Sequence, residues 1–146
     1  MEPPASTVTV VPWVDPLVDE RGLPVSSYYV ELFWLPVLGP SATLLLRRLG
    51  TMATHLPDGI TLDRAWLGSS LGLGNGDSRN APLPRAMERC IRFGVAKRVS
   101  GDRLAVRRKV GHLPQQYVER LHPLMKELHE GWIARPTQSV ATFDKV

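Results

Sequence analysis

The stretch from Ala81 to Val110 constrains the fold most, because a helical pattern runs directly into a hairpin pattern. Over residues 82–94 apolar positions recur three and four apart, which predicts an amphipathic helix. Its inward stripe comprises Leu83, Ala86, Met87, Cys90, Ile91 and Gly94. Pro82 and Pro84 fit only near the helix start, and either Asn80 or Ala81 can be the N-cap. Gly94 is suited to end the helix in the left-handed region.

A tight hairpin is predicted over residues 95–110. The central pair Gly101-Asp102 suits a type II′ turn with Ser100 opposite Arg103. That register pairs Val99 with Leu104 and Lys97 with Val106. The face predicted to pack inward holds Val95, Val99, Leu104 and Val106. The opposite face is small and basic, with Ala96, Arg98, Arg103, Ala105, Arg107 and Lys109.

The positive charge of the chain is concentrated in this same stretch. From Arg79 to Lys109 there are ten basic side chains and two acids, while the whole chain carries only +4, so the remainder is net acidic. The ten are Arg79, Arg85, Arg89, Arg92, Lys97, Arg98, Arg103, Arg107, Arg108 and Lys109. A clustered positive field of this kind favours a polyanionic partner, nucleic acid first. The alternative is a solvated charged face on an ordinary α+β domain.

Residues 62–74, LDRAWLGSSLGLG, carry a second informative pattern. The small Gly68 allows another helix to approach closely, and Gly72 can supply a left-handed residue with Leu73 folding back. Residues 74–80, GNGDSRN, then make a connection longer than a plain helix-turn-helix turn. Arg79 and the amides of this loop can meet a phosphate; the alternative is a mobile solvent loop.

The arginine-faced helix beside the arginine-faced hairpin resembles the recognition helix and wing of a winged helix-turn-helix domain. The sequence is also similar to small actinobacterial proteins of that type. The resemblance covers about residues 41–131. It implies a fold that is mainly α with a small β wing (α+β), in the order helix, strand, helix, helix, hairpin, helix.

The resemblance implies a sequence-specific protein that binds double-stranded DNA, most simply a transcriptional regulator. Helix 82–94 would enter the major groove with Arg85 and Arg89 on base edges. Wing 95–110 would lie on the backbone or in the minor groove. The residues expected at DNA are Arg79, Asn80, Arg85, Arg89, Arg92, Lys97, Arg98, Arg103, Arg107, Arg108 and Lys109. The alternative is a winged-helix module that binds other proteins in a transcription, replication or phage assembly, which the apolar segment around Trp13 favours.

Outside the basic stretch we predict three segments. Residues 1–27 are a proline-rich extended arm that docks on its own domain or on a partner subunit, residues 28–133 are the domain with helical extensions at both ends, and residues 134–146 are a tail. Ser26 is predicted to cap a helix that Pro36 ends, and Ser41 to cap a second helix to about Thr54. Ile60-Thr61 can form a short strand of the wing sheet.

The final predicted helix, from Leu113 to about Trp132, should kink or split at Pro123. Its apolar stripe is predicted to form a homodimer interface, with Tyr117, Leu121, Leu124, Leu128 and Trp132. The alternatives are a dimer contact through the segment around Trp13 and packing of both elements on the protein's own core.

Several functional classes are not expected from this sequence. There is one cysteine, Cys90, which lies on the apolar stripe of its helix and is interpreted as a core residue. No Gly-Lys-Ser/Thr loop, Gly-x-Ser-x-Gly elbow or complete metal-ligand spacing is present, so we predict no enzyme, cofactor or metal site. No signal-peptide pattern is found, and the longest apolar run, 32–38, is too short to span a bilayer. A cytoplasmic, nucleoid-associated protein is therefore expected.

Overall fold

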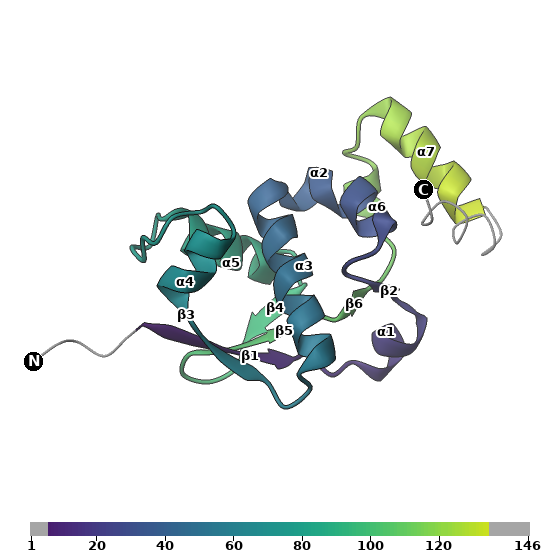
Figure 1. The fold of residues 1–146 in the computed structure, drawn as a ribbon. Coiled ribbons are helices and arrows are strands. Elements are labelled where there is room, and N and C mark those ends of the chain that lie inside the picture. Colours follow the sequence, from purple (N-terminus) through teal and green to yellow (C-terminus); the bar gives the residue numbers. More distant parts are fainter. Residues whose placement is uncertain (1–5, 135–146) are drawn as a thin grey trace, which may run out of the picture.

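A four-stranded mixed sheet lies at the centre of the computed structural model, which describes residues 6–134 (Figure 1). Its strand order is β3 (Ile60–Asp63), β1 (Thr7–Pro12), β5 (Arg103–Val106) and β4 (Ala96–Arg98). β1 runs antiparallel to β3 and parallel to β5. With its helices the described chain is an α+β fold.

The interior strand β1 comes from the proline-rich segment. Its sequence TVTVVP alternates, so that Val8 and Val10 are buried while Thr7 and Thr9 are only half-buried. β-Branched residues are favoured on such a pleated surface. The hydroxyls of Thr9 and Thr61 are 2.8 Å apart across the β1–β3 pair. The segment that we interpreted as an extended arm, residues 1–27, therefore contributes an inner strand of the sheet, followed by α1 (Pro16–Arg21) and β2 (Leu23–Pro24).

The first long helical region differs from the prediction at Pro36. A π-helical turn, Val30–Trp34, continues directly into α2 (Leu35–Leu38), so the prediction that Pro36 ends the helix is wrong. The amide N–H of Leu35 bonds to the carbonyl of Val30, five residues back. Pro36 follows this widened turn and lies in the first turn of α2, where a missing N–H is tolerated. Gly39, with φ of 84°, then ends α2.

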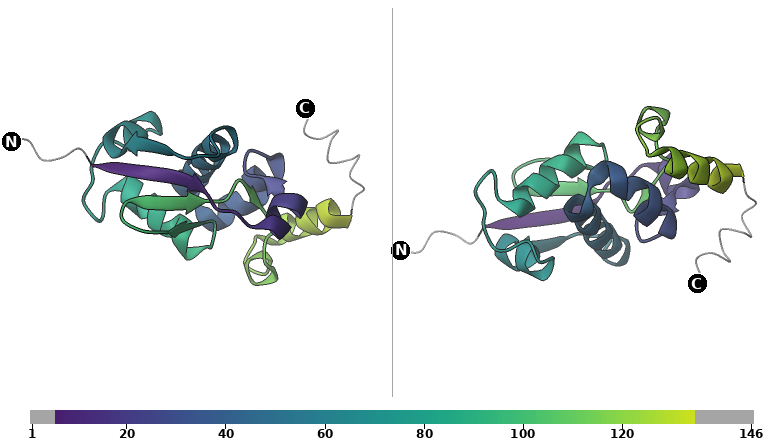
Figure 2. Two further views of the ribbon diagram at one scale, coloured as in Figure 1. Left: turned by 90° about the horizontal axis from the view of Figure 1, so that it is seen from below. Right: turned by 90° about the horizontal axis from the view of Figure 1, so that it is seen from above.

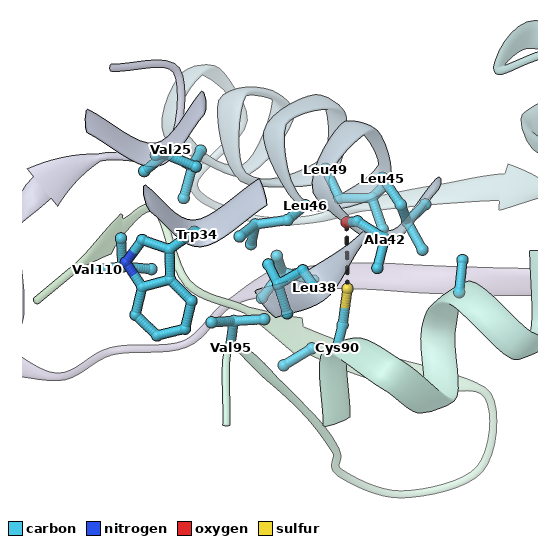
Figure 3. Packing of buried hydrophobic residues seen from close by; sticks show 14 of the residues in the cluster. Val25, Trp34, Leu38, Ala42, Leu45, Leu46, Leu49, Cys90, Val95 and Val110 are labelled. Carbon is cyan, nitrogen blue, oxygen red and sulfur yellow. Dashed lines mark hydrogen bonds between the residues drawn. The ribbon is translucent and has the colours of Figure 1, made fainter. Parts of the chain in front are cut away.

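The central helix α3 (Pro40–His55) crosses the sheet and packs against α5 (Pro82–Arg92). It begins at Pro40 with Gly39 as N-cap, not with Ser41 as predicted. Its buried face includes Leu45, Leu46, Leu49 and Ala53. Figure 3 shows these leucines in one core cluster with Trp34, Leu38 and Cys90, with Leu46 beside Leu38.

The helix pair α4 (Arg64–Ser70) and α5 follows the sequence pattern closely. Asp63 caps α4 by accepting a 3.0 Å bond from the amide of Trp66. Gly72 has φ of 73°, and the amide of Leu73 folds back to the carbonyl of Gly68 at 2.8 Å, as predicted for the helix end. α5 ends at Arg92 before Gly94, whose φ is 75°, and Ala81 is its N-cap.

The predicted register of the hairpin is wrong by one residue. The amide of Val99 bonds to the carbonyl of Arg103, while the amide of Arg103 bonds to the carbonyl of Ser100. Val99 and Ser100 thus both oppose Arg103, which is the pattern of a β-bulge. Gly101 keeps the positive φ of 59° that the predicted turn requires.

The bulge changes which side chains of the hairpin are buried. Ala96 lies opposite Val106, and Lys97 opposite Ala105. Val99, expected to face inward, is 55% exposed, whereas Ala96 and Ala105, expected on the outer face, are buried. β5 is an interior strand between β1 and β4, so Leu104 and Ala105 on its two faces are both covered.

The C-terminal part divides at Pro123 as predicted. After β6 (Lys109–Val110), which pairs with β2, come α6 (Gln115–Val118) and α7 (Pro123–Ala134). α7 lies at the end of the molecule opposite the start of β1 (Figure 2). The ring of Phe33 meets those of His129 and Trp132 edge to face, and this contact docks α7 on the π-helical turn. No helix within residues 6–134 has the length and apolar character needed to cross a membrane.

A buried hydrogen-bond chain holds α7 in place. The hydroxyl of Tyr29 accepts a 2.7 Å bond from the amide of Leu113, so its own proton is directed at Nε2 of His129, also 2.7 Å away. Burial raises the pKa of Tyr29 to about 12, so it remains a donor. Burial, followed by the charge of His112, lowers the pKa of His129, so the neutral imidazole that accepts this bond is favoured.

We expect acidification to weaken the docking of α7. A histidine whose pKa is lowered by folding contributes stability that is present above about pH 6.5 and is lost as pH falls through the folded-state pKa. Protonation removes the Tyr29–His129 bond, at a cost of about 0.5–1.5 kcal/mol. Urea unfolding at about pH 7.5 and about pH 5.5 should therefore show a smaller acid loss for His129→Gln than for wild type. His55→Gln, at an exposed position, should behave as wild type. An equal acid loss in wild type and His129→Gln would contradict this assignment.

Candidate nucleic-acid interface

The outward side of α5 carries the arginines that we predicted for base contacts. Leu83, Ala86, Met87 and Cys90 are buried, which turns Arg85, Glu88, Arg89 and Arg92 outward. Burial raises the pKa of Cys90 to about 12, and its Sγ lies 3.4 Å from the carbonyl oxygen of Ala42. The thiol is therefore held protonated in the core.

Arg89 binds the protein itself. Its Nε donates to the carbonyl of Leu38 at 2.5 Å and its Nη2 to the carbonyl of Val37 at 2.9 Å. The guanidinium also lies 5.1 Å from the ring centre of Phe93. These carbonyls end α2, where a cation is favourable. We had expected Arg89 to reach out to a base edge, but in this structure it fastens α5 to α2.

The base of the wing is tied to the N-terminal segment. The guanidinium of Arg107 lies 3.7 Å from the ring centre of Trp13, donates to the carbonyl of Gly94, and pairs with Asp15 at 3.0 Å. This hydrogen bond from Arg107 lowers the pKa of Asp15. Arg108 pairs with Asp19 at 2.9 Å. The ammonium of Lys97 lies 4.5 Å from the centre of the Trp13 ring. Three of the predicted DNA contacts, Lys97, Arg107 and Arg108, thus have partners within the chain.

Arg98 also has an internal partner. It forms a close ion pair with Glu88, which joins β4 to the outward side of α5. The pair is more than half exposed on both sides, so it adds little stability. Its main effect is to balance the acid that lies among the arginines of α5.

The remaining cations of the basic stretch have no such partner. Within residues 6–134 no hydrogen bond or ion pair involves the side chains of Arg79, Arg85, Arg92, Arg103 or Lys109. The four arginines are exposed and Lys109 is half-buried. They come from the loop before α5, from α5 itself, from the hairpin and from β6. These side chains are available to an anionic partner without breaking an internal contact.

The loop before α5 is held at one point. Asp77 accepts a 2.7 Å bond from the hydroxyl of Ser6 and pairs with Arg64 at 2.8 Å. The bonds from Ser6 and Arg64 lower the pKa of Asp77. Gly74 follows the left-handed residue Gly72 with φ of 76°. The exposed residues Arg79 and Asn80 thus lie just after Asp77, whose carboxylate is held by Ser6 and Arg64.

Arg85, Arg89 and Arg92 line one hollow of about 450 Å³. Its other wall is the first turn of α3, from Gly39 to Ala42. We did not predict this neighbour from the sequence. The Gly39-Pro40 pair marked a helix start, but nothing local indicated that this start would face α5.

The stripe that we predicted as a dimer interface is divided by the fold. Leu121 and Trp132 are buried in the protein's own core, and the half-buried Tyr117 meets Phe93 edge to face. Leu124 and Leu128 remain 68% and 39% exposed. Only these two leucines of the stripe present substantial apolar surface to solvent.

Searches for related proteins returned no match, either among family models, among curated proteins or among solved structures. In residues 6–134 no group of three or more His, Cys, Asp or Glu side chains is placed to hold a metal ion. The functional argument therefore rests on the geometry of the basic surface.

Proposed function

We propose that this chain is a winged-helix protein that binds double-stranded DNA in a sequence-specific way and regulates transcription. The order α3, β3, α4, α5, β4 and β5 corresponds to helix, strand, helix, helix and wing. The insertion of β1 between β3 and β5 is a departure from the arrangement that the resemblance implies. In this proposal α5 lies in the major groove and the β4–β5 hairpin on the backbone or in the minor groove.

The observation that carries the proposal is the set of exposed arginines without internal partners. Arg85 and Arg92 project from α5 and Arg103 from the hairpin. A solvated charged face would commonly interleave both signs, but Glu88 is already balanced by Arg98. Clustered guanidinium groups of this kind attract phosphate and can bond to guanine bidentately.

The structure refines the roles that we propose for the individual residues. Arg85, in the first half of α5, is our candidate for a base edge, and Arg79, Asn80, Arg92, Arg103 and Lys109 are candidates for phosphates. Arg89, Arg107 and Arg108 are assigned to positioning the helix and the wing, because carbonyls and carboxylates of the chain already hold them. Association with the nucleoid would follow from DNA binding.

The direct test is a fluorescence anisotropy titration of selected and random duplexes at about 50 mM salt. Arg85→Ala should cost about 1–3 kcal/mol and relax the sequence preference. Arg103→Ala should weaken binding to all duplexes alike and reduce the salt slope by about 0.9. Arg21→Ala, an exposed arginine of α1 outside the basic stretch, should leave both quantities unchanged. If the wild-type chain binds no duplex at this salt concentration, the DNA proposal fails.

A second candidate function is a winged-helix module that binds proteins, with a homodimer as one form of it. The exposed Leu124 and Leu128 on α7 favour this candidate. An apolar contact would survive high salt, whereas phosphate binding weakens steeply with salt. The same titration repeated over a range of salt concentrations therefore separates the two candidates.

A further inference from the structure

The hollow between α3 and α5 carries positive charge along its α5 wall. Arg85, Arg89 and Arg92 lie one turn apart along α5 and line one wall. The acid among them, Glu88, is paired with Arg98 of β4. No other acidic residue lines the hollow. Three arginine side chains therefore line this space, and the acid among its lining residues is already paired.

The opposite wall presents amide donors at the start of α3. Gly39 offers no capping side chain and Pro40 has no N–H. The amide of Thr43 bonds to the carbonyl of Gly39, the N-cap. The amides of Ser41 and Ala42 precede it in the first turn, where N–H groups have no acceptor within their own helix. Both residues line the hollow. The carbonyls of Val37 and Leu38, one turn earlier, are instead occupied by Arg89.

Arg89 links the two walls and keeps donors available. Its guanidinium has five N–H groups, of which the bonds to Val37 and Leu38 use two. Its Nε lies 3.9 Å from the position that a Cβ on Gly39 would occupy, so it stands against the first turn of α3. Arg89 thus stands beside the end of α3 where an anion is favoured, and three of its N–H groups are not used by these two bonds.

We propose that this hollow binds one phosphate group. The amides of Ser41 and Ala42 and the free donors of Arg89 form the seat, and Arg92 contributes the second cation. Charge-assisted bonds from guanidinium and helix-end amides are the strongest that a protein offers to phosphate. That the phosphate belongs to a phosphodiester of the DNA backbone rests on the proposed function. The binding of a free phosphate in the hollow is independent of that function. In the DNA complex this seat would fix the depth and angle of α5, while Arg85 faces the bases.

The first test uses inorganic phosphate with the full chain. Titration into ¹⁵N-labelled protein, against sodium chloride at matched ionic strength, should shift the amide signals of Ser41 and Ala42 with saturation at millimolar phosphate. Arg92→Gln should weaken this binding by about tenfold. Arg21→Gln removes the same charge from an exposed arginine of α1, outside both the hollow and the basic stretch, and should leave it unchanged. A thermal melt checks that both variants fold, as expected for side chains without internal partners.

The second test identifies the source of the phosphate. Inorganic phosphate should displace a bound duplex from wild type more strongly than chloride at equal ionic strength, and this difference should vanish in Arg92→Gln. Phosphate shifts no larger than chloride shifts, or equal phosphate binding by wild type and Arg92→Gln, would overturn the proposal. If phosphate binds but no duplex does, the seat stands for a free phosphate compound and the DNA function fails. If a duplex binds without competition from phosphate, the DNA function stands and the assignment of its backbone to this seat is overturned.

Discussion

Val10→Asp is expected to abolish or nearly abolish folding. Val10 is fully buried in β1 between β3 and β5, with Ile60 and Leu104 as its register partners. A carboxylate at this position would have no partner, which costs about 4–5 kcal/mol or more. Because a domain of this size is stable by only about 5–15 kcal/mol, most of the free energy of unfolding would be lost. Urea unfolding followed by circular dichroism measures it.

The matched control is the same substitution on the hairpin. Val99 is 55% exposed at the bulge, so Val99→Asp should change the free energy of unfolding by less than about 0.5 kcal/mol. Similar small effects of Val10→Asp and Val99→Asp would mean that residues 7–12 are an arm apart from the core. The comparison thus tests whether the proline-rich segment belongs to the sheet.

Two glycines within helices are expected to respond to alanine with opposite signs. A Cβ on Gly50 of α3 would lie 2.6 Å from the carbonyl oxygen of Arg107 and 2.6 Å from Cγ2 of Val25. Gly50→Ala should therefore lower the free energy of unfolding by about 1–3 kcal/mol, despite the better helix propensity of alanine. A Cβ on Gly131 of α7 would meet nothing within 4 Å, so Gly131→Ala should raise it by about 0.5–1 kcal/mol.

Thermal or urea unfolding of the two variants beside wild type decides this prediction. A stabilising Gly50→Ala would show that α3 does not approach the chain after β5 as closely as described. Val25 would then have more room beside Gly50 than its close approach in this structure leaves. Gly131→Ala is the control for a general effect of alanine on helix stability, because it makes the same substitution as Gly50→Ala in another helix.

Elements with a local cause were predictable from the sequence. The apolar spacing of α5 and the left-handed glycines Gly72, Gly94 and Gly101 depend on neighbours within a few residues, and the structure confirms them. The split at Pro123 has the same local origin. Helix periodicity and positive-φ glycines act within one turn of chain, so their consequences can be read without the fold.

The hairpin shows where local reasoning ends. The turn at Gly101 followed from its sequence, but the bulge at Val99 reversed the faces of the strand before it. Burial of both Leu104 and Ala105 depends on β1 lying beside β5, which joins residues far apart in the chain. A single extra residue moves every side chain to the other face, so register cannot be derived from alternation alone.

The sequence by itself determined which residues carry positive charge and that α5 would turn a row of arginines outward. Only the tertiary structure decided which of these arginines are free. Asp15 and Asp19 reach Arg107 and Arg108 across some ninety residues, and the end of α2 holds Arg89. The same packing brings Ser41 and Ala42 of α3 into one hollow with Arg92 of α5. Charge is a property of composition, but its neutralisation depends on distances of a few ångströms, which only the folded chain sets.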